Sequence, residues 1–208
     1  MTLEETLKQI RPLNKEAMES AGKRWDSIAK PLHSLGKMED LVIQIAGIQE
    51  TPDISVKKRA LVYMCADNGV VEEGVTQTGQ EVTAIVAENF LSGDTSACVM
   101  CRQCGTDVFP VDVGMVVNTK VPTDLKVAMG TKNMTKEPAM TREEAVKGLE
   151  AGIEMVRRLK EKGYTLLATG EMGIGNTTTS SAVASVLLDE PVEKMTGRGA
   201  GLSSEGLN

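Results

Sequence analysis

The sequence predicts an α/β fold, with a mostly parallel sheet and flanking helices in three layers, of the Rossmann-like kind. Residues 60–66, 107–114 and 164–168 are short apolar runs, typical of strands that are buried on both faces. A helical pattern follows each run, so strands and helices alternate along the chain. Residues 1–57 show helical patterns only. We therefore expect a small N-terminal helical segment at 1–57 and an α/β nucleotide- and base-binding domain at 58–208, incomplete at its C-terminus.

The N-terminal segment is expected to hold three helices. Pro12 separates the first from the second, which starts at Asn14. A third is predicted between residues 34 and 49, where apolar residues recur at helical spacing: Met38, Leu41, Val42, Ile45 and Ile48. The lone histidine, His33, is expected to pack or hydrogen-bond near the Pro31 turn rather than to act in catalysis.

Four stretches are assigned within the α/β domain. A helix is predicted from about Glu81 to Phe90, and another over the cysteine-rich stretch that ends at Gly105. Residues 115–139 are polar and are expected to cross the surface without regular structure. Thr141 and Glu144 form a capping box that opens a long helix. Its inward stripe is expected to contain Ala145, Leu149, Ile153, Val156 and Leu159.

Cys98, Cys101 and Cys104 recur every three residues, which allows two interpretations. Three thiolates suit an iron–sulfur cluster, and this reading predicts a coloured, iron-containing protein. The stretch lacks the fourth cysteine and proline of such motifs, however, and Cys65 lies in a predicted buried strand. We favour a packed helix face, because a free cysteine behaves as a small hydrophobic residue. No metal or cofactor is expected.

Composition narrows the class of partner. The 208 residues include 23 basic and 29 acidic side chains and only five aromatic ones, which argues against nucleic acid as a partner. No apolar run approaches the roughly 20 residues of a membrane span, and no signal-peptide pattern is present. With four cysteines and no signal, a cytoplasmic location is expected. Residues 203–205 start a helix close to the end of the chain; a frayed tail and a truncated chain both fit, and we favour truncation.

Polar and glycine-rich residues follow the three predicted strands, at 67–69, 112–114 and 170–176. Ligands bind beyond such strand ends in open α/β sheets. The third stretch is the most informative, because its glycines let the backbone approach a ligand and the following helix offers N–H groups to an anion. Its glycine spacing is neither that of dinucleotide-binding loops nor that of Walker motifs. Residues 196–201 are a weaker candidate for a second phosphate or ribose loop.

Glu171 is an unusual residue to find in a phosphate site, because a carboxylate and a phosphate repel each other. One interpretation is that it faces a base or an N–H donor of the ligand. The other is that it caps the following helix. The pattern of residues leaves both open.

Five motifs in order resemble the nicotinate-nucleotide–dimethylbenzimidazole phosphoribosyltransferase family. They are Lys-Pro-x-x-Ser-Leu-Gly-x-x-Glu at 30–39, Cys-Ala-Asp-Asn-Gly-Val at 65–70, the stretch 73–84, Val-Asp-Val-Gly at 111–114, and Gly-Glu-Met-Gly-x-x-Asn-Thr-Thr at 170–178. The resemblance covers essentially the whole sequence. It corresponds to the N-terminal part of longer family members, so a truncated chain is expected.

The resemblance implies transfer of phosphoribosyl from nicotinate mononucleotide to 5,6-dimethylbenzimidazole, giving α-ribazole 5′-phosphate and nicotinate in cobamide synthesis. The inverted anomeric carbon suits direct attack by the acceptor nitrogen opposite the departing nicotinate, which requires both substrates in line and removal of the acceptor's N–H proton. The family also implies a homodimer when the chain is full length, with no cofactor or metal.

The family's site residues carry over as follows. Glu171 matches a glutamate that lines the benzimidazole pocket and is a candidate base. Thr78, Val86 and Met172 are assigned to acceptor binding; Thr78 and Val86 replace a serine and a glutamine of some members. Phosphate and ribose binding are assigned to Gly173, Gly175, Asn176, Thr177, Gly199 and Gly201. Asn68 stands where many members have histidine, so the resemblance gives its side chain no role.

The family's main catalytic glutamate and a phosphate-contacting lysine match no position here. We therefore expect weak activity or none from this chain alone, together with an unfinished sheet edge and exposed apolar surface. A non-catalytic nucleotide- or base-binding module, or a subunit completed by another chain, is the alternative. A further alternative keeps the reaction but changes the acceptor to adenine, another benzimidazole or a phenolic compound.

Overall fold

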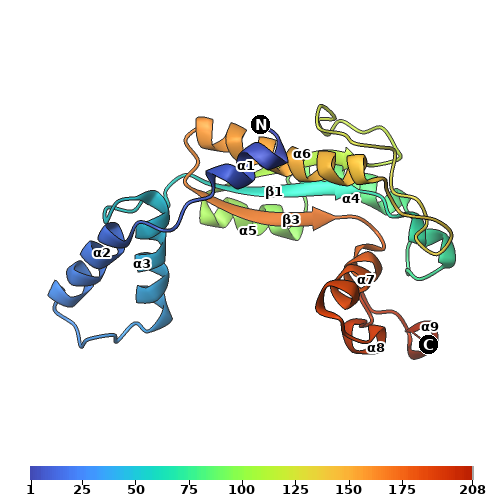
Figure 1. The fold of residues 1–208 in the computed structure, drawn as a ribbon. Helices are drawn as coiled ribbons and strands as arrows, with labels where there is room; N and C mark the ends of the chain where they lie inside the picture. The colour runs from blue at the N-terminus through green and yellow to red at the C-terminus, as the bar shows by residue number, and fades with distance from the viewer. Residues whose placement is uncertain (208) are drawn as a thin grey trace. The chain divides into compact units, whose positions relative to one another are not determined.

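The computed structural model describes residues 1–207 and divides them into two compact units, Thr2–Lys57 and a second that begins at Lys58 (Figure 1). The first unit contains three helices, α1 (Leu3–Gln9), α2 (Lys15–Ser27) and α3 (Lys37–Gln49). These match the three predicted helical segments. Side chains cap the first two, since Thr2 accepts a hydrogen bond from Glu5 N and Asn14 accepts one from Ala17 N.

An ion pair stabilises the turn between α2 and α3. Lys30 Nζ lies 2.8 Å from Glu39 Oε1, and the Glu39 side chain is only 2% exposed. The same oxygen accepts the Leu35 N–H at 3.1 Å. Together with Lys30, this bond lowers the pKa of Glu39, although burial opposes them. His33 lies in this turn with a positive φ of 53° and an exposed side chain, so the expected packing of the imidazole is wrong.

The second unit is built on a three-stranded parallel sheet of β1 (Arg59–Ala66), β2 (Thr106–Gly114) and β3 (Leu166–Met172). The strand order is β2-β1-β3, with β1 in the centre. Arg59 aligns with Thr106 on one side and with Leu166 on the other. The sheet and its flanking helices confirm the predicted fold class.

The third strand differs from its prediction at both ends. It was expected at 164–168 and lies at Leu166–Met172. The reason is pairing, because β3 stays in register with β1 as far as Cys65 opposite Met172. Backbone hydrogen bonds of a parallel ladder do not depend on side-chain polarity, so the strand continues through Glu171. Glu171 and Met172 therefore belong to the sheet and not to the loop after it.

Helices cover the two faces of the sheet (Figure 1). One core cluster joins Cys65 of β1 to Phe90 of α4 (Glu81–Ser92) and Cys98 of α5 (Ser96–Cys104). The other joins Val62 of β1 to Met155 and Leu159 of α6 (Arg142–Glu161). The remaining helices are η1 (Gly69–Glu73), α7 (Asn176–Leu188), α8 (Val192–Met195) and α9 (Ser204–Leu207).

Helix α6 begins at the predicted capping box but buries a different stripe. Thr141 and Glu144 form both capping hydrogen bonds. The buried residues are Ala151, Met155 and Leu159, whereas Leu149 and Val156 are 57% and 51% exposed. Of the predicted stripe, Leu159 alone is fully buried.

Residues 115–139 contain no helix or strand, as predicted, but they do more than cross the surface. Met115 is fully buried and Val121 is 2% exposed, and both belong to the cluster around Cys65 and Phe90. This segment therefore closes one side of the core.

Apolar side chains are exposed on the C-terminal half of α7, and one edge of β3 has no partner strand among the described residues. Within residues 1–207, β3 pairs with β1 alone. On α7, Val186 and Leu187 are 81% and 77% exposed, and Val183 and Leu188 are more than half exposed. No helix among these residues combines the length and apolar character that crossing a membrane requires.

Candidate functional site

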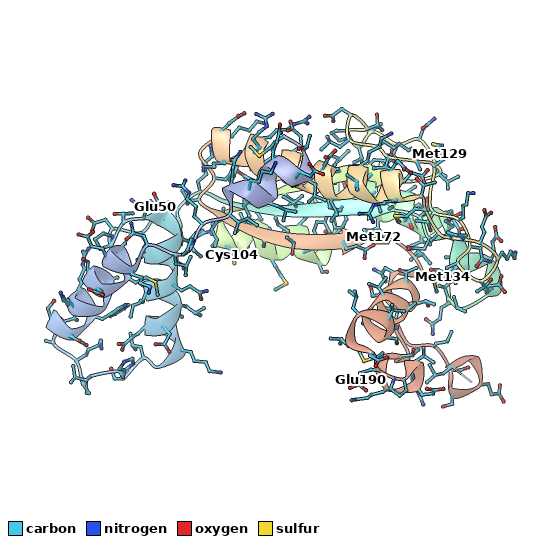
Figure 2. The ribbon with its side chains drawn as sticks, in the orientation of Figure 1. Glu50, Cys104, Met129, Met134, Met172 and Glu190 are labelled. Carbon is cyan, nitrogen blue, oxygen red and sulfur yellow. The ribbon has the colours of Figure 1, made fainter. Side chains whose placement is uncertain are left out.

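A cavity of about 270 Å³ lies where β3 ends and α7 begins. Figure 2 shows Met172 at this end of β3. Three segments line most of the cavity, and they are residues 75–78, 172–178 and 196–200; Leu202, Gly206 and Leu207 complete the lining. The position agrees with the rule that ligands bind beyond the carboxyl ends of parallel strands.

Two glycines shape the turn from β3 into α7. A Cβ atom on Gly173 would overlap the carbonyl oxygen of Ala66, so only glycine fits there. Gly175 has a φ of +86° and is the N-cap of α7, with no side chain capping the helix. The N-terminal end of α7 thus lies at the cavity, with the Asn176 and Thr178 amides donating to the Gly173 and Gly175 carbonyls at 3.0 and 3.1 Å. Such an arrangement favours an anion.

The second glycine-rich stretch lies against the first. Gly199 has a φ of +53°, and a Cβ atom on it would be 2.7 Å from Thr177 Oγ1. The side chain of Gln77 donates a hydrogen bond to the carbonyl of Gly201. These contacts bring residues 75–78, the start of α7 and residues 196–201 around one space, although Gln77 and Gly201 are 124 positions apart in the sequence.

Seven of the predicted site residues line this cavity, and three do not. The lining residues are Thr78, Met172, Gly173, Gly175, Asn176, Thr177 and Gly199. Val86 packs against the core cluster around Cys65. Gly201 contacts the site through Gln77, and Glu171 through a hydrogen bond from the Asn176 side chain.

Two further lining residues lie within the glycine-rich stretches that the sequence indicated, but neither had been given a role of its own. Arg198 is the one basic side chain among the lining residues of the described chain. Its guanidinium donates to Ser204 Oγ at 2.7 Å. Ile174 lines the cavity between the two glycines. A cation flanked by glycines at 197 and 199 was the available signal for Arg198.

Glu171 is held next to the cavity and not over the helix end. Its Oε2 accepts a hydrogen bond from Asn176 Nδ2, whereas the N-cap of α7 is Gly175. Loss of hydration raises the pKa of Glu171 above its ordinary value of 4.5, and the Asn176 bond partly opposes this rise. The carboxyl is still exposed on one side, so the effect is modest. A carboxylate with a raised pKa is a better proton acceptor than an ordinary one.

We expect Glu171→Gln to increase stability at pH 7, because it removes a carboxylate that folding partly desolvates. Since the folded-state pKa is raised, the stability contributed by Glu171 is greatest at low pH and is lost as pH rises through that pKa. Urea unfolding from pH 4 to pH 8 should therefore show the difference between variant and wild type growing with pH.

The matched control is Glu143→Gln, which removes a carboxylate from the first turn of α6. It should decrease stability at pH 7, because that charge is favourable at a helix N-terminus. A Glu171→Gln variant less stable than wild type at pH 7 would contradict the prediction.

Three charged side chains, Asp67, Asp112 and Lys126, form a charge cluster near the carboxyl ends of β1 and β2. Asp112 is fully buried, and its Oδ1 accepts the N–H groups of Gly114 and Met115 at 2.9 and 2.7 Å. Its Oδ2 lies 3.0 Å from Lys126 Nζ. Asp67, which is 1% exposed, accepts the Val116 N–H at 2.7 Å, and burial raises its pKa. The cluster fixes the loops after β1 and β2.

The cysteine side chains of α5 are less buried than predicted. Cys98 is buried, but Cys101 is half-buried and Cys104 is exposed. Within residues 1–207, no three His, Cys, Asp or Glu side chains are grouped so as to hold a metal ion.

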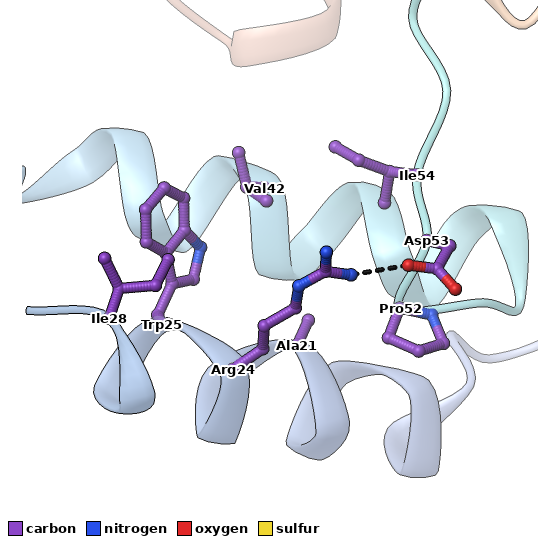
Figure 3. A pocket seen from close by; sticks show the side chains of 8 residues that line it. All are labelled: Ala21, Arg24, Trp25, Ile28, Val42, Pro52, Asp53 and Ile54. Atoms are coloured by element: carbon purple, nitrogen blue, oxygen red, sulfur yellow. Dashed lines mark hydrogen bonds and ion pairs between the residues drawn. The ribbon is translucent and has the colours of Figure 1, made fainter.

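A second cavity, of about 290 Å³, lies within the N-terminal unit between α2 and the segment after α3 (Figure 3). Trp25 and Ile28 form an apolar wall, and Arg24 pairs with Asp53 at 2.5 Å. Both charged side chains are mostly exposed, at 63% and 80%. Few polar groups converge on this cavity, so we assign the chemistry to the cavity at the end of β3.

A family model described as phosphoribosyltransferase matches residues 10–208. The chain belongs to this family. Its relatives include nicotinate-nucleotide–dimethylbenzimidazole phosphoribosyltransferases of Ruminiclostridium cellulolyticum, 51% identical over 209 residues, and Clostridium tetani, 48% identical over 206 residues. These alignments cover 100% and 98% of this chain, but only 59% and 57% of the relatives.

The fold is similar to that of solved family members. The crystal structure of CobT from Thermus thermophilus matches with a TM-score of 0.86 and 39% identity. The match covers 92% of this chain and 59% of that one. The chain thus spans about three-fifths of the length of the relatives to which it is similar.

Proposed function

We propose that this chain carries the substrate-binding part of an enzyme that transfers phosphoribosyl from nicotinate mononucleotide to 5,6-dimethylbenzimidazole, giving α-ribazole 5′-phosphate and nicotinate. The observation that carries the proposal is the cavity at the end of β3, where two glycine turns, the start of α7 and Arg198 surround one space. Relatives named for this reaction match nearly the whole chain.

The donor fits the glycine-rich side of the cavity. Its phosphate would bind the backbone of Gly173 and Gly175 at the start of α7, where amides and the helix dipole favour an anion. Arg198, in the 196–200 segment that also lines the cavity, supplies a positive charge. The hydroxyl-bearing Thr177, next to Gly199, is suited to the ribose, and Asn176 links this side to Glu171.

The acceptor is assigned to the side formed by Thr78 and Met172, with Glu171 nearby. A benzimidazole nitrogen attacks the anomeric carbon and forms the new C–N bond. The bond to nicotinate breaks on the opposite face, and nicotinate leaves with its electron pair. The acceptor's N–H proton then passes to a base, for which Glu171 is the candidate in this chain. Val86 is not among the residues that line the cavity; it is half-buried against the same core cluster as Met172, so a contribution to acceptor choice would pass through its neighbours.

We further propose that the additional length of the relatives completes this site. The exposed apolar side chains of α7 and the outer edge of β3 are suited to such a covering segment. If the site needs such a segment, the 208 residues alone should show weak activity or none. The same surface favours the second candidate, a binding module completed by another chain. The homodimeric state and the cytoplasmic location stay predictions.

We expect Arg198→Ala to weaken nicotinate mononucleotide binding about tenfold, because a charge-assisted hydrogen bond to phosphate is lost. Calorimetric titration of the purified chain measures this directly. Nicotinate riboside, which lacks the phosphate, should bind wild type and variant equally. Arg198→Lys should retain part of the affinity, since it keeps the charge but loses the planar donor pair.

Arg142→Ala is the control, because it removes an exposed charge of the same kind from the start of α6. Its affinity for nicotinate mononucleotide should equal that of wild type. Equal affinities of the Arg198→Ala variant and wild type would remove Arg198 from the donor site. Absence of binding by the wild-type chain would count against the proposed function itself.

A further inference from the structure

We propose that Asn68 and Thr83 are positioning residues that hold the peptide groups of Ile174 from two sides and so fix the Gly173–Gly175 turn in its ligand-binding form. The inference rests on the proposed function, because it names what orients the donor-binding turn. Neither residue is among the lining residues of the cavity. Both reach Ile174 from elements distant in sequence, by 106 and 91 positions.

Thr83 holds the amide side of Ile174. It lies in the first turn of α4 and is completely buried. Its Oγ1 accepts the Ile174 N–H at 3.0 Å. Burial raises the pKa of the nearby Asp67, and the Val116 N–H and the Thr83 hydroxyl partly oppose this rise. Because a backbone N–H can only donate, Thr83 Oγ1 is the acceptor in the contact with Ile174.

Asn68 holds the carbonyl side of the same residue. It follows β1, and its Nδ2 donates to the Ile174 carbonyl at 3.0 Å. Its Oδ1 lies 3.3 Å from the hydroxyl of Thr179, in the first turn of α7, and shares that hydroxyl's single proton with the Asn176 carbonyl at 3.0 Å. One amide group thus ties the turn to the helix whose N-terminus would bind the phosphate.

The two contacts matter because glycines alone leave the turn free to move. Gly173 and Gly175 flank Ile174, and glycine gives the backbone little conformational restriction. A site that binds through backbone amides needs those amides fixed before the ligand arrives. The hydrogen bonds of Thr83 and Asn68 to Ile174, which we call the clamp on Ile174, supply this restraint. Neither the Thr83 nor the Asn68 side chain lines the cavity.

The experiment compares Thr83→Val with Thr83→Ser in the purified 208-residue chain. The valine has nearly the shape of threonine but cannot accept a hydrogen bond, whereas serine can. Amide hydrogen exchange at Ile174, followed by NMR without ligand, should be about two- to tenfold faster in Thr83→Val, as expected for one lost hydrogen bond. Nicotinate mononucleotide should bind more weakly by a similar factor, and Thr83→Ser should restore both properties.

Thr95→Val is the control, because Thr95 Oγ1 likewise accepts one backbone N–H, that of Cys98 at 3.1 Å, but at the start of α5. It should leave Ile174 exchange and nucleotide affinity unchanged. Should Thr83→Val not fold, Asn68→Ala tests the other half of the clamp by the same two readouts. Unchanged Ile174 exchange in the variants, or an equal loss of affinity in Thr95→Val, would overturn the inference.

The two proposals fail in different ways. If the wild-type chain does not bind nicotinate mononucleotide, the proposed function fails, and exchange at Ile174 still decides whether the clamp exists. If nucleotide binds but Thr83→Val and Asn68→Ala leave exchange and affinity as in wild type, the clamp alone is rejected.

Discussion

Gly173→Ala is expected to weaken nicotinate mononucleotide binding by more than about tenfold, that is by more than ~1.4 kcal/mol. The added methyl group would overlap the carbonyl oxygen of Ala66, at the end of β1. A backbone atom in a parallel sheet cannot rotate away as a flexible side chain can, so the turn must move instead. The same Cβ would lie 2.8 Å from Glu171 Oε1 and 2.9 Å from Asn68 Nδ2. The substitution therefore also disturbs the Glu171 carboxylate and the clamp on Ile174.

Gly148→Ala is the matched control for this substitution. Gly148 lies within α6, and a Cβ atom there would meet no atom within 4 Å. Alanine should therefore stabilise the chain by about 0.5–1 kcal/mol through helix propensity and leave nucleotide affinity unchanged. Calorimetric titration and urea unfolding measure both effects. Wild-type affinity in Gly173→Ala would show that the turn is not the donor site.

Lys126→Met is expected to destabilise the second unit by about 3–5 kcal/mol, because it leaves the buried Asp112 carboxylate without its cation. Asp112 is fully buried and Lys126 is 14% exposed. The buried Asp67 is nearby, and its pKa responds to the charges of both Asp112 and Lys126. Removing the one positive charge leaves two carboxylates to repel each other in a poorly solvated region.

Urea unfolding at pH 7 tests this prediction against Lys136→Met. Lys136 pairs with Glu72 at 2.8 Å, but both side chains are more than 60% exposed, so losing this pair should change stability far less. Adding Asp112→Asn to Lys126→Met should cost less than the sum of the two single changes, because the pair is removed together. A loss below about 1 kcal/mol in Lys126→Met would mean that the ion pair does not hold these loops.

Local patterns predicted much of the fold. Continuous apolar runs located β1 and β2 to within a residue, and a capping box located the start of α6. The end of β3 could not be predicted, because Glu171 and Met172 join the strand only through pairing with β1. The buried face of α6 was misplaced by about 100°, because a helix with several apolar stripes does not reveal which of them the sheet covers.

The candidate site was predictable in its glycines but not in its supporting contacts. Gly173 and Gly175 stand out because their spacing after a strand is unusual in sequence. Thr83, by contrast, looks like any threonine within a helix, and only the folded chain brings it to Ile174. Val86 is half-buried and packs against the cluster around Cys65, as Met172 does, and its assignment to the acceptor pocket stays a prediction.

Nicotinate release from nicotinate mononucleotide, with and without 5,6-dimethylbenzimidazole, tests the central claim most directly. The chain is assayed alone and joined after Asn208 to the remaining C-terminal part of the Ruminiclostridium cellulolyticum relative. We predict acceptor-dependent release by the joined protein, a large decrease on Glu171→Gln, and little or no release by the chain alone. No acceptor-dependent release by the joined protein, in an assay where the intact relative is active, would contradict the account.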